Sequence, residues 1–249
     1  MDKINIGVDN YKVRSYQMDM LGRLTLTSIA GYLQESAGNH ANRNGFGYLQ
    51  MSESGLIWVL TRLKIIIHSY PVWGDELELN TWVVNREKFF SRRDFEIKSK
   101  NGDVIIAATT GWMLLDATHK RPRLVDNFPM NIQMYPDKLA VDQELTKLNG
   151  PKNIDNEAHY KVKYSDLDVV RHVNNIQYLR IILDTFAFEY RSRFHIKSFE
   201  INYLSEALIN QDLKILTANK SNSNDYQHEI VRIDDGSIIC RAESYWEKD

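Results

Sequence analysis

The two halves of this sequence repeat each other, and the repeat constrains the chain to a pair of similar domains. The segment Tyr11 to Arg14, followed by Asp19, corresponds to the segment Tyr160 to Lys163, followed by Asp168. Tyr160 follows Tyr11 by 149 residues, and Asp168 follows Asp19 by the same 149 residues. The ends of the copies also correspond, with offsets of 134 residues between Gly102 and Gly236 and between Trp112 and Trp246. A repeat of this length indicates a duplicated structural unit.

Each copy predicts the same order of elements. Apolar residues at spacings of three and four predict an amphipathic helix from Leu26 to Ala41 and another from Ile176 to Tyr190. Strand-like runs follow at 57–68, 76–85, 90–99 and 103–115, and again at 196–204, 212–218, 226–233 and 237–246. A curved antiparallel sheet can cover the apolar face of such a helix. We therefore predict an α+β tandem (double) hotdog fold, in which a curved antiparallel sheet wraps one long central helix in each half.

Prolines mark the middle of the chain. Four of the five prolines lie between residues 122 and 151, in a stretch without apolar periodicity. Such a stretch is typical of a connection between domains. We predict an N-terminal hotdog domain at residues 1–118, an inter-domain linker at 119–158 and a C-terminal hotdog domain at 159–249.

Composition excludes several classes of partner. The 31 basic and 33 acidic residues give a formal net charge of −2, and no Lys/Arg-rich arm occurs, so we expect no nucleic-acid and no membrane partner. No apolar run is long enough for a transmembrane helix, and the N-terminus lacks a signal pattern, so we expect a cytoplasmic protein. The single cysteine, Cys240, cannot form an intrachain disulfide or a thiolate zinc site, and the histidines lack ligand spacing. We expect no metal and no cofactor.

A dense polar cluster precedes the second predicted helix. Asp168 and His172 lie four residues apart in the segment 165–175. A carboxylate can act as general base on water, and the free N–H groups of a helix N-terminus can stabilise an oxyanion. Asp166 or Asn174 could instead serve only as a helix cap.

The two copies differ at this cluster. His172 corresponds to Arg23, and Asn174 and Asn175 correspond to Thr25 and Leu26. A cap alone would not require these residues in only one copy. The difference favours chemistry in the second copy and another task, such as shaping a substrate pocket, in the first.

The same residues resemble a known family. The segment Asp168 to Asn175 resembles the pattern Asp-x-Asn-x-His-Val-Asn-Asn of the acyl-acyl carrier protein thioesterases. Five more segments resemble the family in the right order, namely 33–40, 56–62, 70–75, 81–83 and 91–95. The match covers about residues 11–246. The resemblance implies hydrolysis of fatty acyl-acyl carrier protein in fatty acid biosynthesis, with release of the free fatty acid and the acyl carrier protein.

The resemblance also implies site residues. The family's catalytic glutamate follows its histidine by 34 residues, which is Glu206 here, so the implied catalytic residues are Asp168, His172 and Glu206. Val173, Asn174 and Asn175 are expected to support the oxyanion or the active site. Ala207 stands where plant members often have cysteine, which excludes a cysteine nucleophile there, and Val170 replaces the family asparagine. Activity could be retained with Asp168 and backbone N–H groups, or it could be reduced.

Two further residue sets follow from the resemblance. Chain-length selection in the family belongs largely to the N-terminal domain, so the acyl-pocket candidates are Leu26, Ile29, Ala30, Leu33 and Trp58; an ordinary core would use the same residue types. The carrier is acidic, so the docking candidates are Lys88, Arg92, Arg93, Lys120, Arg121 and Arg123. The alternatives are an acyl-CoA thioesterase and a catalytically weak acyl-binding hotdog module. A monomer and a homodimer both fit two hotdogs in one chain.

Overall fold

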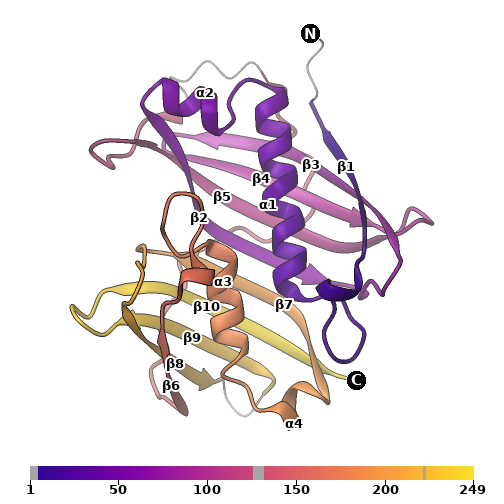
Figure 1. The fold of residues 1–249 in the computed structure, drawn as a ribbon. Helices are drawn as coiled ribbons and strands as arrows, with labels where there is room; N and C mark the ends of the chain where they lie inside the picture. Colours follow the sequence, from indigo (N-terminus) through magenta and orange to yellow (C-terminus); the bar gives the residue numbers. More distant parts are fainter. Residues whose placement is uncertain (1–4, 126–131, 221–222) are drawn as a thin grey trace. The chain divides into compact units, whose positions relative to one another are not determined.

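The chain divides into two compact units, unit 1 from Met1 to Leu145 and unit 2 from Thr146 to Asp249. The computed structural model describes residues 5–125, 132–220 and 223–249 (Figure 1). Unit 1 contains β1 (Gly7–Lys12), α1 (Leu26–Arg43), α2 (Tyr48–Glu53), β2 (Leu56–Ile67), β3 (Glu76–Glu87), β4 (Phe90–Lys98) and β5 (Val104–Asp116). Unit 2 contains β6 (Asn156–Lys161), α3 (Asn175–Leu183), α4 (Phe188–Arg191), β7 (Phe194–Tyr203), β8 (Asp212–Asn219), β9 (Asp225–Arg232) and β10 (Ile238–Lys248).

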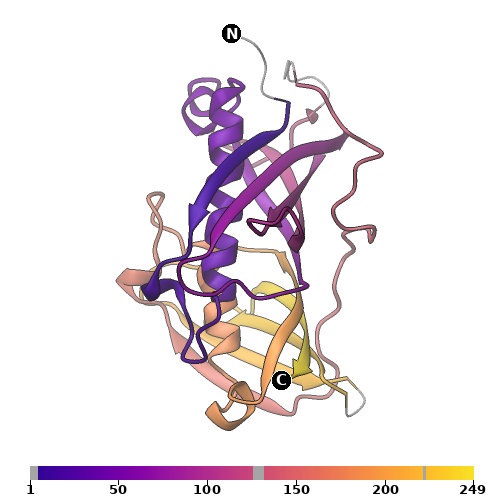
Figure 2. The ribbon, with the colours of Figure 1, turned by 90° about the vertical axis from the view of Figure 1, so that its right-hand side faces the viewer.

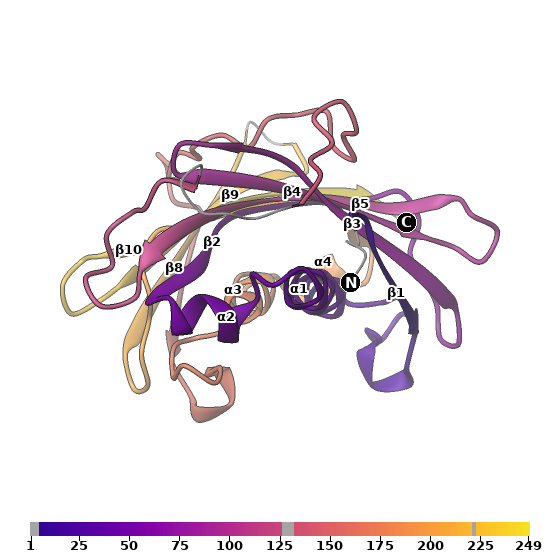
Figure 3. The same cartoon turned by 90° about the horizontal axis from the view of Figure 1, so that it is seen from above.

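Unit 1 is an antiparallel sheet around α1. Its hydrogen-bonded strand order is β1-β3-β4-β5-β2. Thr25 caps α1 by accepting a hydrogen bond from the Ser28 N–H at 3.2 Å, and the apolar face of α1 packs toward β1 and β3. Seen from above, the sheet curves over α1 (Figure 3). The periodic residues Leu26, Ile29, Ala30, Leu33 and Ala37 are all buried.

Unit 2 repeats this plan with a shorter helix. Its strand order is β7-β10-β9-β8-β6, again antiparallel. The prediction of one helix to Tyr190 is wrong, because α3 ends at Leu183 and the short α4 begins at Phe188. The Thr185 hydroxyl donates to the Ile182 carbonyl at 2.8 Å. Beyond the end of α3, the Phe186 ring contacts the Trp246 ring, with ring centroids 4.7 Å apart. Otherwise the α+β tandem hotdog architecture is confirmed.

The described residues of the predicted linker up to Leu145 belong to unit 1. The Trp82 Nε1–H donates to the Lys138 carbonyl at 2.8 Å, and the Ala140 N–H donates to Asp94 Oδ2 at 2.9 Å. Figure 2 shows residues 132–145 on the face of the unit 1 sheet opposite α1. At the other end of the predicted linker, Leu148 already belongs to unit 2, where its N–H donates to Asn202 Oδ1 at 2.8 Å. Backbone polar groups of the segment find partners in each unit, which periodicity could not show.

Within the described part of the chain, no helix is both long and apolar enough to cross a membrane.

Candidate active site

The site begins with a tight loop before α3, from Leu167 to Val173. These two residues pair as an isolated antiparallel bridge, and the Asp168 N–H donates to the His172 carbonyl at 2.9 Å. Asp168 Oδ1 accepts from the Val170 N–H at 3.0 Å and from the His172 N–H at 3.3 Å. A side chain that binds backbone N–H groups of the next few residues fixes a turn. The Asp168 carboxylate therefore holds the backbone that carries His172.

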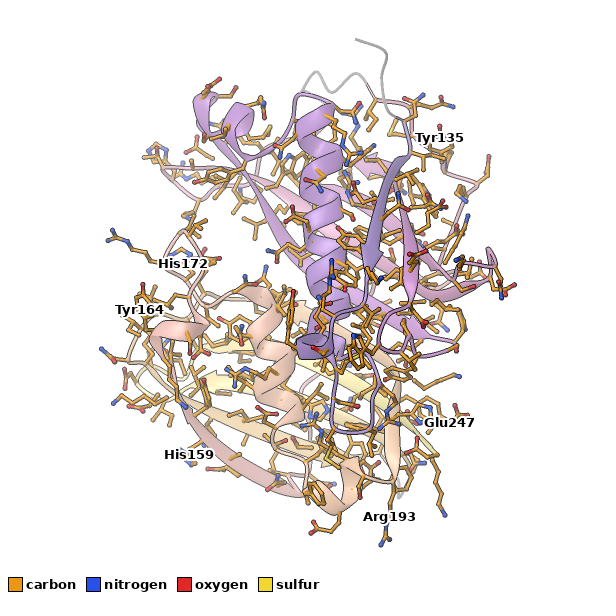
Figure 4. All side chains as sticks on the ribbon, turned by 45° about the vertical axis from the view of Figure 1, so that its right-hand side comes forward. Tyr135, His159, Tyr164, His172, Arg193 and Glu247 are labelled. Atoms are coloured by element: carbon orange, nitrogen blue, oxygen red, sulfur yellow. The ribbon has the colours of Figure 1, made fainter. Side chains whose placement is uncertain are left out.

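His172 meets Glu206 in this structure. His172 Nδ1 lies 3.4 Å from Glu206 Oε1, and the two side chains are 28% and 53% exposed. Figure 4 labels His172 on the loop that precedes α3. Glu206 comes from the segment between β7 and β8, more than thirty residues along the chain. An imidazole beside a carboxylate, accessible to water, can accept a proton from water and donate it again.

Three hydrogen bonds hold the backbone around Glu206. The Val173 N–H donates to the Ala207 carbonyl at 3.0 Å, which ties this segment to the His172 loop. The Ala207 N–H donates to the Tyr178 hydroxyl at 3.1 Å, and Arg232 Nη2 donates to the Glu206 carbonyl at 2.7 Å. Burial raises the pKa of Tyr178, so its hydroxyl stays protonated. Tyr178 and Arg232 were not predicted, since only the fold brings α3 and β9 to this segment.

Unit 1 contains the same loop without the same chemistry. The Asp19 N–H donates to the Arg23 carbonyl at 2.8 Å, and Asp19 Oδ1 accepts from the Leu21 N–H at 2.9 Å and the Arg23 N–H at 3.0 Å. Met18 and Leu24 form the equivalent bridge. The loop geometry at Asp168 is therefore a property of the fold in both copies.

The residues that face each other across these loops differ between the units. The Leu24 N–H donates to the Pro71 carbonyl at 3.0 Å, as the Val173 N–H does to the Ala207 carbonyl, so Tyr70 is the counterpart of Glu206. The Arg23 guanidinium lies over the Tyr70 ring, 5.6 Å from its centroid. Unit 1 thus has a cation–π contact where unit 2 has the His172–Glu206 pair.

The expected oxyanion donors are only partly available. The backbone N–H groups of Val173 and Asn174 are already bound, to the carbonyls of Ala207 and Asp166, so neither N–H is available to an oxyanion in this arrangement. Support of the active site by these two residues stays a prediction. Asn174 is the N-cap of α3, and its Oδ1 accepts from the Ile176 N–H at 3.0 Å. The Asn175 N–H, at the first position of α3, has no hydrogen-bond partner among the described residues. It is the remaining candidate of the three.

Asp166 has a structural role. Its carboxylate is buried, Arg180 Nη2 donates to Oδ1 at 2.7 Å, and the Lys163 N–H donates to Oδ2 at 2.7 Å. The Tyr160 hydroxyl donates to the same carboxylate at 2.8 Å. The carboxylate has no capacity left for chemistry on a substrate.

The acyl-pocket candidates lie in the interior of unit 1. Leu26, Ile29, Ala30 and Leu33 are buried on α1. Trp58 is half-buried and packs against a cluster made of Phe46, Met51, Val83, Leu114, Val125 and Ile132. Its buried Nε1–H has no hydrogen-bond partner among the described residues. Burial fits a wall of a pocket as well as a core, so the pocket role stays a prediction.

The docking candidates divide into two groups. Arg93 is only 5% exposed, its Nη1 contacts His40 Nδ1 at 2.9 Å, and burial lowers its pKa to about 10. Arg92 binds the buried Asp94 carboxylate at 3.0 Å. The charges of these two arginines face partners within unit 1, which does not favour docking, and their docking role stays a prediction. Lys88, Lys120, Arg121 and Arg123 are exposed, and Arg123 pairs with Asp116 at 2.7 Å.

No group of three or more His, Cys, Asp and Glu side chains is placed to hold a metal ion within residues 5–125, 132–220 and 223–249. Cys240 is buried, and burial raises the pKa of its thiol. A protonated, buried thiol is unreactive.

The fold and the site define a class of protein, a tandem hotdog whose second unit places the His172–Glu206 pair at the loop before α3. Comparisons place the chain within this class. Sequence models of the acyl-ACP thioesterase N-terminal domain and C-terminal domain match residues 7–129 and 150–248. The chain therefore belongs to the acyl-ACP thioesterase family.

Relatives and solved structures agree. A palmitoyl-acyl carrier protein thioesterase of Arabidopsis thaliana is 29% identical over 95% of this chain and 63% of its own length, and a dodecanoyl-[acyl-carrier-protein] hydrolase of Cinnamomum camphora is 30% identical over 95% and 66%. Structures of an acyl-ACP thioesterase from Bacteroides thetaiotaomicron (TM-score 0.88, 28% identity) and a 12:0-ACP thioesterase from Umbellularia californica (TM-score 0.84, 26% identity) each match over 98% of both chains. The chain spans less than two thirds of the length of the curated relatives.

Proposed function

We propose that this chain hydrolyses the thioester of fatty acyl-acyl carrier protein, releasing a free fatty acid and the carrier. The observation that carries the proposal is the His172–Glu206 pair, which unit 2 has and the equivalent loop of unit 1 lacks. The named activities of the relatives, on palmitoyl and dodecanoyl carrier substrates, supply the substrate class. The reaction needs water, one proton acceptor and one proton donor, and the pair can supply both of these proton-transfer roles.

The mechanism assigns a separate task to each site residue. Glu206 binds the Nδ1–H of His172 and orients the ring, so that Nε2 can take a proton from water while the water oxygen attacks the thioester carbonyl carbon. The oxyanion that forms is stabilised at the N-terminus of α3, where the Asn175 N–H is free of described partners. The C–S bond then breaks, and His172 returns its proton to the departing thiolate. Asp168 positions the loop and exchanges no proton.

We propose that unit 1 holds the acyl chain. The candidates Leu26, Ile29, Ala30, Leu33 and Trp58 supply apolar surface, and unit 1 has no histidine–carboxylate pair at its own loop. Lys88, Lys120, Arg121 and Arg123 remain the docking candidates for an acidic carrier, since their side chains are exposed. A cytoplasmic location and a homodimer remain proposals from the sequence.

The test is release of free fatty acid from acyl-carrier proteins and from matched acyl-CoAs. We expect carrier-dependent hydrolysis by the wild type and a loss of about 100- to 10,000-fold in kcat for Glu206→Gln, with little change in KM. Glu189→Gln, on the exposed α4, is the matched control and should keep full activity.

Each other outcome rejects part of the proposal. Hydrolysis of acyl-CoA alone would identify an acyl-CoA thioesterase instead. Binding of acyl-carrier without hydrolysis would identify an acyl-binding module. Full activity of Glu206→Gln would remove Glu206 from the mechanism.

A further inference from the structure

The residue before His172 stands in a backbone conformation that favours glycine. Arg171 has φ of 66°, and its counterpart in the unit 1 loop is Gly22, with φ of 76°. The two N–H groups make the same hydrogen bond, to the Asp168 carbonyl at 3.0 Å and to the Asp19 carbonyl at 3.1 Å. Two copies of one loop therefore differ at this position in the side chain and not in the backbone.

The loop itself does not require a side chain at this position. A left-handed φ is strained for a residue with a Cβ atom, and glycine avoids that strain. The second left-handed pair of the two units, Asn210 (φ of 65°) and Gly74 (φ of 88°), uses asparagine, which tolerates this region better than arginine. Strain held next to reacting groups is a reason to look for a function of the strained residue.

The guanidinium of Arg171 is available for a ligand. The residue is exposed, and no described residue forms an ion pair or a side-chain hydrogen bond with it. Two other arginines of unit 2 are engaged, Arg180 with Asp166 at 2.7 Å and Arg232 with Asp235 at 2.9 Å. The strained position thus presents an unpaired cation one residue from the proposed catalytic histidine.

We propose that Arg171 binds the phosphate group of the phosphopantetheine arm that carries the thioester. This inference rests on the proposed function, because a tethered acyl thioester reaches His172 only at the end of such an arm. The arm carries its phosphate at the end away from the sulfur, outside the reacting centre, where an exposed side chain can meet it. Guanidinium groups bind phosphate in a planar, bidentate geometry that lysine cannot reproduce.

The flanks of Arg171 fit the same arm. Val169 is 95% exposed and Val170 is 43% exposed, so the loop offers apolar contacts on one side of the cation. Such a surface matches an arm that is largely neutral along its length and anionic at one end. Val170, which stands where the family has asparagine, therefore belongs to the contact surface for the arm.

The experiment compares four substrates with one acyl chain: acyl-carrier protein, acyl-CoA, acyl-phosphopantetheine and acyl-pantetheine, which lacks the phosphate. For Arg171→Gln we expect kcat/KM to fall about 10- to 100-fold on the three phosphate-bearing substrates, mainly through KM, and to stay within twofold on acyl-pantetheine. Arg171→Gly fits the backbone without strain and should show the same pattern. Arg171→Lys should recover only part of the loss.

Arg193→Gln, at an exposed arginine labelled in Figure 4, is the matched control and should leave all four substrates unchanged. An equal loss on acyl-pantetheine would overturn the proposal, because Arg171 would then act on the loop and not on the phosphate. A loss confined to acyl-carrier protein would overturn it as well, in favour of the protein surface of the carrier. So would unchanged activity on every substrate.

A binding measurement separates this proposal from the proposed function. Calorimetry with phosphopantetheine and pantetheine needs no hydrolysis. We expect the wild type to bind phosphopantetheine at least tenfold more tightly than pantetheine, and Arg171→Gln to lose that difference. If the wild type hydrolyses none of the four thioesters, the proposed function fails and the binding result still decides the role of Arg171. Equal affinities of the wild type for the two ligands would overturn it.

Discussion

Asp168 should act on the loop and not on the proton, and its counterpart in unit 1 allows a direct test. Asp168 Oδ1 accepts the N–H groups of Val170 and His172, while Asp19 Oδ1 accepts those of Leu21 and Arg23. We therefore compare Asp168→Asn and Asp168→Ala with Asp19→Asn and Asp19→Ala. Asparagine keeps an oxygen at the acceptor position, and alanine removes it.

The expected stability changes follow from the bonds that are lost. Each alanine variant leaves two backbone N–H groups without their acceptor, as in the loss of a helix cap, which costs about 0.5–2 kcal/mol. We expect about 1–2 kcal/mol for Asp168→Ala and a similar value for Asp19→Ala, to which the partly exposed Asp19–Arg23 pair adds at most about 0.5 kcal/mol. The asparagine variants should lose less than about 1 kcal/mol, because a neutral acceptor forms weaker bonds than a carboxylate.

The expected activities separate the two aspartates. Asp168→Asn should keep kcat within about tenfold of the wild type, since the loop stays in place and the His172–Glu206 pair is intact. Asp168→Ala should lose more, because a displacement of about 1 Å at a reacting group can reduce the rate 100-fold. Both Asp19 variants should keep full activity.

Denaturant unfolding measures the stabilities, and release of free fatty acid measures the activities. If Asp168→Asn loses as much activity as Glu206→Gln while its unfolding midpoint stays near that of the wild type, the charge of Asp168 takes part in the chemistry. The assignment of Asp168 to positioning alone would then be refuted.

Three further predictions concern other parts of the chain. His228 is buried between Thr217 and Ser244, and burial lowers its pKa to about 3. The stability that neutral His228 contributes is therefore fully present above about pH 6.5 and decreases as the pH falls toward 3, by about 2 kcal/mol at pH 5. A His228→Gln variant whose free energy of unfolding falls as much between pH 7 and pH 5 as that of the wild type would contradict this. Val170→Asn restores the family residue at an exposed position, so the free energy of unfolding should change by less than about 0.5 kcal/mol and kcat by only a few-fold. A 100-fold rise in kcat would mean that the His172–Glu206 pair is incomplete without asparagine. Ile29→Trp should shift the chain-length profile toward shorter acyl groups, as measured with a panel of acyl-carriers, and an unchanged profile in a folded variant would place Ile29 in the core alone.

The fold was predictable because periodicity is a local signal and because the repeat shows that the same local pattern occurs twice in the chain. Spacings of three and four located α1 within two residues of its end, and the N-cap Thr25 precedes it as propensity predicts. The second helix was predicted too long, because Phe186 and Tyr190 continue the spacing although their rings pack in an aromatic cluster beyond the end of α3. Periodicity records which residues are buried, and it does not record which element carries them.

The residues of the site were predictable in part, but the contacts between them were not, because those contacts depend on the fold. His172 and Glu206 were implied by a family spacing, and their contact at 3.4 Å depends on the fold. Arg92 and Arg93 are docking candidates because the carrier is acidic, yet Arg93 is buried against His40, and the sequence does not show that burial. Tyr178 and Arg232 hold the backbone of the segment that carries Glu206, and the sequence does not predict this role. Each of the two residues acts through a hydrogen bond between elements that are distant in sequence.

The duplicated loop separates what the fold requires from what the chemistry requires. Both copies keep the aspartate, the bridge and the same backbone hydrogen bonds, so these features are explained by folding alone. The copies diverge at the facing pair, which is His172 with Glu206 in unit 2 and Arg23 with Tyr70 in unit 1, and at the left-handed position, which is Arg171 in unit 2 and Gly22 in unit 1. Arginine cannot accept a proton at neutral pH and tyrosine carries no charge there, so the unit 1 loop cannot activate water. Function should therefore be sought at the positions where two copies of one backbone disagree, and Arg171 is the one of them that neither a family pattern nor the demands of folding explains.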